Sequence, residues 1–285
     1  MSVLALALIM TSALAHATWN LLAKRVEGGA AFIWLFDGAS TVMLAPAVVL
    51  IVVLHGLHLT PVALLLILAS STLHMGYFVL LNRGYRAGDL SLVYPLARGT
   101  GPLLATAGAV GVLGERPHPI VLAGALLIGA GAVALGANPR DLWRQRAGPA
   151  VGLALATGVL IAGYTLTDKE AVDLQHAPPL FYLWALTLLS TLWLTPAASR
   201  HGATVRQLWR QHRTEILTIG LLSPVAYLLV LEALVFTPVS YVAPAREVGI
   251  LFGAIMGFHF LNEGEIPRRL SAAALMVAGV VLLAT

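Results

Sequence analysis

Apolar segments of roughly 20 residues, the length of helix that crosses about 30 Å of hydrocarbon, follow one another almost without interruption from Val3 to the C-terminus. Of the 285 residues, 59% are hydrophobic and 11% are charged, whereas a typical soluble domain has about 25% charged residues. A soluble fold cannot bury that much apolar surface. The sequence therefore indicates an integral membrane protein, with the lipid bilayer as its main partner.

Charges and Pro/Gly clusters divide the apolar sequence into ten predicted spans. They cover residues 3–23, 30–54, 61–82, 89–113, 119–137, 149–167, 178–197, 215–236, 239–262 and 268–284. We predict helices because open sheet edges cannot face lipid, and because the short alternating segments of a membrane barrel are missing. The predicted fold is an all-α integral membrane protein with ten transmembrane helices.

The two halves of the chain carry a similar series of a tyrosine, a proline, an arginine and a glutamate. The series is Tyr77, Pro95, Arg98 and Glu115 in the first half, and at nearly equal spacing Tyr227, Pro244, Arg246 and Glu263 in the second. Because five spans is an odd number, two copies of a five-helix unit insert in opposite orientations, which is typical of transporters. We predict two inverted repeats, 1–137 and 149–285, joined by a linker loop at 138–148.

The basic residues are distributed unevenly between the predicted loops. Most of the 17 Lys and Arg residues fall in the odd-numbered loops, and Arg116 and Lys169 are the two in even-numbered loops. The positive-inside rule then places the odd loops in the cytoplasm and both termini outside. Although the net charge is +4, these residues occur singly or in pairs between spans, so we expect no nucleic-acid partner.

Several short motifs together resemble the EamA branch of the drug/metabolite transporter superfamily. The motifs are His-Ala-Thr-Trp-Asn at 16–20, Tyr-Pro-Leu-Ala at 94–97, and Leu-Gly-Glu-Arg-Pro at 113–117. The resemblance covers essentially the whole chain. It implies a secondary transporter in the inner (plasma) membrane, with a cavity lined by helices one, three, four, six, eight and nine. Members of the family export amino acids, other metabolites or drugs. The resemblance also implies cytoplasmic termini, opposite to the charge count.

Three charged residues, Arg98, Arg246 and Glu247, lie well inside predicted spans, where a charge is costly and tends to face a cavity or a partner. Arg98 and Arg246 occupy equivalent positions in the two repeats. We expect them to bind an anionic group of the substrate, with Glu247 as an ion-pair partner, a proton-coupling carboxylate or the contact for a substrate amine. The alternative is a structural Arg–Glu pair that pins helices four and nine.

Further candidate binding residues are aromatic or polar side chains that share helix faces, as is usual in small-molecule cavities. They are His16, Trp19, Asn20, His74, Tyr77, Tyr94, Tyr164, Tyr227 and Glu232. Trp19 has the alternative role of an interfacial anchor, and Glu232 is preferred to Asp37. Three prolines, Pro95, Pro102 and Pro244, are candidate gating kinks because proline removes a helix hydrogen bond.

Other residues are assigned structural roles. Glu115 and Glu263 precede helices five and ten, where a carboxylate is stabilised by the free N–H groups. Spans five and ten are rich in Gly and Ala, which predicts close packing with each other or across a homodimer. The nine histidines lack metal-ligand spacing, so we expect no metal or cofactor.

These features together predict a secondary transporter that exports a small metabolite by alternating access. Two arginines and one glutamate favour an amino acid, an organic acid or a phosphonate-like anion, with protons as a possible coupling ion. A multidrug exporter of hydrophobic cations is the main alternative. An integral-membrane enzyme or an accessory subunit is the alternative of another class, but the clustered acids that such an enzyme would need are missing.

Overall fold

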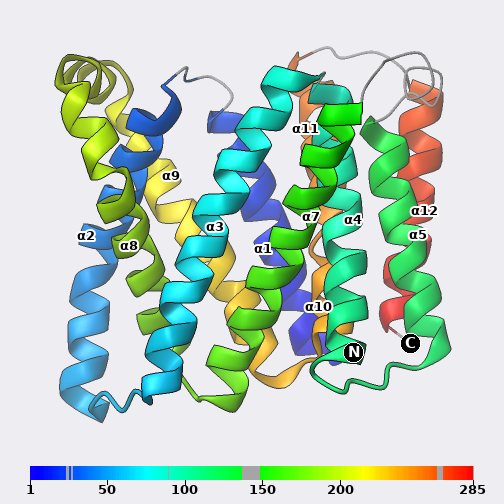
Figure 1. The fold of residues 1–285 in the computed structure, drawn as a ribbon. Helices are drawn as coiled ribbons and strands as arrows, with labels where there is room; N and C mark the ends of the chain where they lie inside the picture. The colour runs from blue at the N-terminus through cyan, green and yellow to red at the C-terminus, as the bar shows by residue number, and fades with distance from the viewer. Residues whose placement is uncertain (24–25, 27, 89, 137–147, 262–265, 285) are drawn as a thin grey trace.

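The computed structural model describes residues 1–23, 26, 28–88, 90–136, 148–261 and 266–284, with the backbone alone at 90, 91, 135, 136, 254, 255, 257–261 and 266–270. Lys24, Arg25, Glu263 and residues 138–147 of the predicted linker lie outside the described residues. Within the described ranges the chain folds into a bundle of helices (Figure 1). No strand occurs in these ranges.

The helices follow the predicted spans closely. In the first half they are α1 (Val3–Ala23), α2 (Gly29–His55), α3 (Pro61–Ala87), α4 (Leu90–Gly111) and α5 (Pro119–Gly136). In the second half they are α7 (Gly148–Lys169) with a π-helical turn η1 (Glu170–Leu174), α8 (Pro179–Arg200), α9 (Gly202–Phe236), α10 (Val239–Ala245), α11 (Val248–Leu261) and α12 (Ile266–Ala284). Each predicted span therefore contains at least one helix.

Six of the described helical segments are long and apolar enough to cross a membrane, judged by length and composition: α1, α2, α3, α7 with η1, α8 and α9. Shorter apolar helices occupy Pro119–Ala134 and Ser271–Ala284. Large apolar side chains also face outward, with Val53 75% exposed on α2 and Leu65 65% exposed on α3. A surface of this kind suits lipid rather than water. The number of spans, ten, and their inverted arrangement stay predictions.

Three segments differ from the prediction. The predicted loop at 199–213 is wrong, because α9 already begins at Gly202 and bends at His212, where φ is −129° and ψ is 27°. The sixth predicted span ended at residue 167, but the helix continues through Lys169 into η1. The ninth predicted span is interrupted, since α10 ends at Ala245 and α11 begins at Val248.

Helices α5 and α12 pack directly against each other at one side of the bundle (Figure 1). A Cβ atom on Gly124 would lie 2.8 Å from the carbonyl oxygen of Gly279, and a Cβ on Gly279 would lie 2.6 Å from that of Gly124. Only glycine allows two backbones to approach this closely. The prediction that the two small-residue helices pack against each other is therefore confirmed, and a homodimer through them stays a prediction.

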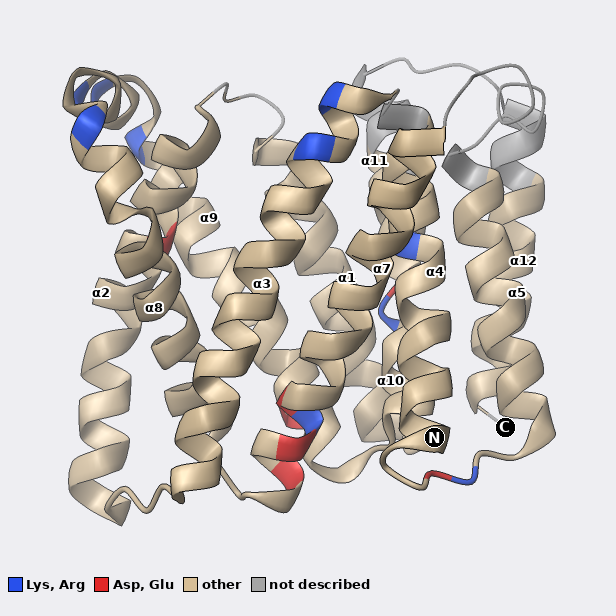
Figure 2. Ribbon diagram, viewed as in Figure 1, with Lys and Arg blue, Asp and Glu red and all other residues tan. Residues whose placement is uncertain are grey.

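The two ends of the bundle differ in charge (Figure 2). Lys and Arg gather at the end opposite the two chain termini, on the last turn of α3 and around the start of α9. We call this the basic end. Asp and Glu are concentrated toward the other end, near the C-terminus of α7 and in the loop before α5. The asymmetry predicted from the loop charges is therefore present in the folded bundle.

Candidate functional site

A cavity of about 500 Å³ lies inside the bundle. Side chains from α1, α2, α3, α4, α7, α8 and α9 line it, together with Arg246 from the connection between α10 and α11. The family resemblance led us to expect walls from helices one, three, four, six, eight and nine. The structure adds α2 and α8, which supply Phe36, Asp37, Thr187 and Ser190 among others.

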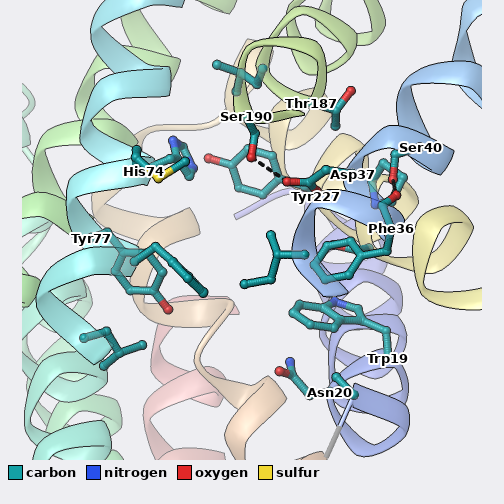
Figure 3. Close-up of a pocket in the computed structure, with 18 of the residues that line it drawn as sticks. Trp19, Asn20, Phe36, Asp37, Ser40, His74, Tyr77, Thr187, Ser190 and Tyr227 are labelled. Carbon is teal, nitrogen blue, oxygen red and sulfur yellow. Dashed lines mark hydrogen bonds between the residues drawn. The ribbon is translucent and has the colours of Figure 1, made fainter. Parts of the chain in front are cut away.

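Most of the candidate binding residues meet at this cavity. Those that line it are His16, Trp19, Asn20, His74, Tyr77, Tyr94, Arg98, Tyr164, Tyr227 and Arg246. Figure 3 shows His74 and Tyr77 on one side, facing Trp19, Phe36 and Asp37 on the other. Glu247 is buried behind the wall, and Glu232 does not line the cavity. The helical spacing of these side chains therefore predicted correctly which of them line the cavity wall. Their roles in binding stay predictions.

Arg98 and Glu247 form a buried ion pair. The Nε atom of Arg98 lies 3.0 Å from Oε2 of Glu247, at an angle outside the range of a hydrogen bond, and the side chains are 7% and 2% exposed. Arg98 lies on α4, and Glu247 lies between α10 and α11. The pair therefore joins the fourth and ninth predicted spans, as the structural alternative required. It also neutralises most of the charge that Arg98 would present to a ligand.

Arg246 is placed differently from its sequence counterpart Arg98. Its Nη2 atom donates to the Tyr164 hydroxyl at 3.5 Å, and its guanidinium carbon lies 6.0 Å and 5.7 Å from the ring centres of Tyr164 and Tyr227. Among the described residues, no carboxylate lies within 4.0 Å of it. Arg246 is therefore a cation on the cavity wall, held by two aromatic rings and without an ionic partner in the described part of the chain.

Aromatic rings form much of the remaining wall. His74 stacks on Tyr164 with ring centres 3.9 Å apart, and Tyr77 meets Tyr164 edge-on at 6.1 Å. On the opposite side, Trp19 contacts His16 at 4.9 Å and Phe36 at 6.5 Å. The alternative role of Trp19 as an interfacial anchor does not fit this inward position. Flat apolar surfaces beside a few polar groups suit an organic ligand.

The structure reverses the preference between Asp37 and Glu232. Asp37 lines the cavity, and its Oδ2 atom accepts a hydrogen bond of 2.5 Å from the Ser190 hydroxyl (Figure 3). Glu232 lies on the same helix as Tyr227, but a separation of five residues turns it about 140° away. Ser223 and Tyr227 are four residues apart and both line the cavity. They define the face of α9 that points to the cavity, and Glu232 does not share this face.

Asp168 lies behind the cavity wall, where it binds the lining residue Tyr227, and this position was not predicted from the sequence. It is fully buried and accepts hydrogen bonds from Ser70 at 2.5 Å, from Tyr182 at 2.6 Å and from Tyr227. The predicted sixth span ends at residue 167, one residue before Asp168, and so leaves Asp168 in a loop. A signal was available, since Asp168 follows Tyr164 by four residues and so shares its helix face. These four residues, Ser70, Asp168, Tyr182 and Tyr227, are called the Asp168 cluster below.

The helix continues past two of the candidate gating prolines and breaks after the third. Helix α4 continues through both Pro95 and Pro102, whereas α10 ends one residue after Pro244. Around that break the amides of Glu247, Gly249 and Ile250 each bond to the carbonyl three residues earlier, at 2.9–3.1 Å. This tighter, 3₁₀-like winding carries Arg246 and Glu247. The broken backbone therefore lies at the charged part of the cavity, and a gating role stays a prediction.

Glu115, in the loop before α5, and Lys169, at the end of α7, each stabilise an end of another helix. The carboxylate of Glu115 accepts from the amides of Val239 at 2.7 Å and Ser240 at 3.0 Å, so it caps α10 and not α5 as predicted. Lys169 donates to the carbonyl oxygens of Leu234 and Thr237 at the end of α9 and pairs with Asp173 at 2.7 Å. Both contacts are structural.

In the part of the chain that the structure describes, no group of three His, Asp or Glu side chains is arranged to hold a metal ion. The described residues instead line a cavity that is rich in aromatic side chains. It has a cation at Arg246, a carboxylate at Asp37 and aromatic surfaces between its polar groups.

Comparison with known proteins agrees with this architecture. None of the curated proteins matches the chain. A solved structure titled "Crystal structure of protein" is similar with a TM-score of 0.76 over 98% of this chain and 95% of that chain. Their sequence identity is 16%, so the likeness shows a shared fold. Residues 148–285 match the EamA-like transporter family. This second half belongs to the EamA-like transporters of the drug/metabolite transporter superfamily, and the chain is a multi-pass membrane protein.

Proposed function

We propose that this protein is a secondary transporter that binds the anionic group of a small metabolite at Arg246 and exports it across the inner membrane by alternating access. The substrate class is an amino acid, an organic acid or a phosphonate-like anion. The observation that carries the proposal is the guanidinium of Arg246 on the cavity wall, which has no ionic partner within 4.0 Å among the described residues. An intramembrane charge of this kind is costly to keep and is typically retained for a ligand or an ion pathway.

The pairing of helices supports an inverted repeat and therefore alternating access. Exchange of the two halves relates α1 to α7, α2 to α8, α3 to α9, α4 to α10 with α11, and α5 to α12. The observed contacts respect this exchange, since α1 packs on α9 as α3 packs on α7, and α4 packs on α7 as α1 packs on α11. Helices α2 and α8 pack on each other, as do α5 and α12. In inverted-repeat transporters, such halves rock around a shared site.

The extent of the cavity fits the state in which an exporter takes up its substrate. It reaches Ala23 at the end of α1, Gly29 at the start of α2 and Tyr85 near the end of α3, all at the basic end of the bundle. The positive-inside rule places that end in the cytoplasm. A substrate would then enter from the cytoplasm, as export requires. At the other end, the buried Asp168 cluster ties α7 to α3, α8 and α9.

The test is ligand binding by full-length protein purified in detergent. Unfolding temperature is measured with succinate, L-leucine and methylphosphonate, in wild type, Arg246→Gln and the control Arg83→Gln, which removes an exposed arginine at the basic end. We expect stabilisation by at least one of these anion-bearing probes in wild type and in the control, and its loss in Arg246→Gln. Stabilisation that survives in Arg246→Gln would refute the assigned site.

The multidrug alternative predicts a different result in the same assay. A hydrophobic cation such as tetraphenylphosphonium would stabilise the wild-type protein, and the three anion-bearing probes would not. Arg246 argues against this outcome, because a cation would meet its unpaired positive charge on entering the cavity. The binding result therefore distinguishes the two classes of substrate directly.

A further inference from the structure

The wall formed by α2 and α8 contains a carboxylate that the proposed anion site does not use. Asp37 lines the cavity, and the one hydrogen bond it accepts through its side chain, from Ser190, goes to Oδ2. No Lys, Arg or His of the described residues lies within 4.0 Å of it. Like Arg246, Asp37 is therefore an ionisable intramembrane group without an ionic partner in the described part of the chain, which is costly unless a ligand or ion uses it.

The hydroxyl groups around Asp37 already donate their hydrogen atoms in hydrogen bonds within the protein. Ser190 donates to Asp37, Thr187 donates to the Trp184 carbonyl at 2.9 Å, and Ser40 donates to the carbonyls of Phe36 and Gly220. Each hydroxyl has one hydrogen to give. The side chains of this wall can therefore accept hydrogen bonds from a ligand, and Asp37 adds a carboxylate (Figure 3). Such a wall favours a ligand group that carries several N–H donors.

Arg246 and Asp37, which have no ionic partner within 4.0 Å in the described ranges, are opposite in sign and do not pair with each other. Arg246 is held by Tyr164 and Tyr227, and Asp37 is held by Ser190. Both line the same cavity of about 500 Å³. A ligand that carries one positive and one negative group satisfies both, whereas a simple anion would leave Asp37 desolvated and unpaired.

We propose that Asp37 is the subsite for a substrate ammonium group, and that the transported metabolite is a zwitterion whose anionic group binds Arg246. This inference rests on the proposed function and narrows its substrate class. The glutamate first considered for a substrate amine, Glu247, is buried and paired with Arg98. Asp37 takes that role because its carboxylate is open to the cavity.

The experiment compares probes that differ only in the ammonium group. Affinities are measured by isothermal titration calorimetry on the full chain for L-leucine, 4-aminobutanoate and 6-aminohexanoate, and for their analogues without the amine, 4-methylpentanoate, butanoate and hexanoate. The three pairs cover different distances between the charges. For at least one pair, wild type should bind the zwitterion about tenfold or more tightly than its analogue.

Two matched variants separate binding from structure. Asp37→Asn keeps an acceptor for Ser190 but removes the charge, and Ser190→Ala removes the hydrogen bond but keeps the charge. We expect Asp37→Asn to bind the zwitterion only as tightly as its analogue, and to bind the analogue at least as tightly as wild type does, because no unpaired charge is then desolvated. Ser190→Ala should keep the preference for the zwitterion. If Asp37→Asn does not fold, Asp37→Ser serves as the second variant, with the same expectation.

The outcomes are distinguishable from those of the proposed function. If wild type binds the amine-free anions through Arg246 but shows no preference for any zwitterion, the ammonium subsite is wrong and the anion site stands. If Ser190→Ala abolishes the preference as Asp37→Asn does, Asp37 acts through the α2–α8 contact and the subsite is also wrong. If neither class of probe binds to wild type, the anion site and the ammonium subsite are both refuted.

Discussion

Arg98 pairs with Glu247, although Glu247 is adjacent in sequence to Arg246. This pairing neutralises Arg98 and leaves Arg246 without the nearby carboxylate as its partner. The pair of Arg98 and Glu247 is buried, with 3.0 Å between its charged atoms. Arg246 instead contacts two tyrosine rings. The two arginines are equivalent in the repeated sequence pattern, yet one joins helices and the other remains available to a ligand.

The first prediction concerns the stability of this ion pair. Removal of one partner leaves an uncompensated buried charge, so Arg98→Gln and Glu247→Gln should each lower the free energy of unfolding by about 3–5 kcal/mol. The double variant should cost less than the sum of the two single changes, because neither charge remains. Chemical unfolding of the purified protein measures all four forms. Strictly additive losses would show that the two side chains do not interact.

The second prediction concerns the cap of α10. Glu115→Ala removes the acceptor for the amides of Val239 and Ser240, and a lost helix cap typically costs about 0.5–2 kcal/mol. The first turn of α10 should then exchange its amide hydrogens faster, which mass spectrometry of the peptide that covers 238–245 measures. The control is Arg116→Ala, which removes an exposed neighbour. Equal exchange in the two variants would exclude the capping role.

Much of the fold was predictable from the sequence, because hydrocarbon thickness and backbone hydrogen bonding leave few ways to arrange long apolar segments. The helix boundaries of α1 and α12, for example, lie within two residues of the predicted spans. The small residues of α5 and α12 likewise indicated their mutual packing. These properties depend on composition and spacing, which are local to the chain.

The pairing of charged groups was less predictable, because it depends on contacts between distant segments. Glu115 caps a helix 124 residues away in the chain, and nothing in its neighbourhood distinguishes α10 from α5 as the helix it caps. Asp168 was missed for a related reason. Hydropathy ends a span at the first acidic residue, but three hydroxyl donors compensate this carboxylate inside the bundle.

The third prediction tests the close contact of α5 and α12. Gly124→Ala would place a Cβ atom 2.8 Å from the carbonyl oxygen of Gly279. The helices must separate to accept it, at a cost of about 1–3 kcal/mol. Gly152 on α7 is the matched control, because an added Cβ there meets nothing within 4 Å. Gly152→Ala should therefore stabilise the protein by about 0.5–1 kcal/mol. A neutral Gly124→Ala would contradict the packing.

The fourth prediction concerns the stability of the Asp168 cluster. Asp168→Ala leaves the hydroxyls of Ser70, Tyr182 and Tyr227 without their acceptor. Each unsatisfied buried hydroxyl costs about 1–3 kcal/mol. Tyr182→Phe removes one donor and leaves the other two in place, so it should cost about 1 kcal/mol. A loss in Asp168→Ala no larger than that in Tyr182→Phe would show that the three donors find other partners.

The fifth prediction is that the same cluster closes the cavity at the end opposite the basic end. Ser71 lines the cavity next to Ser70, and the chain contains no cysteine, so Ser71→Cys provides a single reporter thiol. A membrane-impermeant maleimide, applied to right-side-out and to inverted vesicles, should label this thiol from one face in the otherwise wild-type protein. With Asp168→Ala added, labelling should occur from both faces, because the hydrogen bonds that the Asp168 carboxylate accepts from α3, α8 and α9 are lost there. The control is Glu170→Gln, a neighbouring carboxylate outside the cluster. If labelling in the Asp168→Ala background stays confined to one face while the protein remains folded, the barrier lies elsewhere in the bundle.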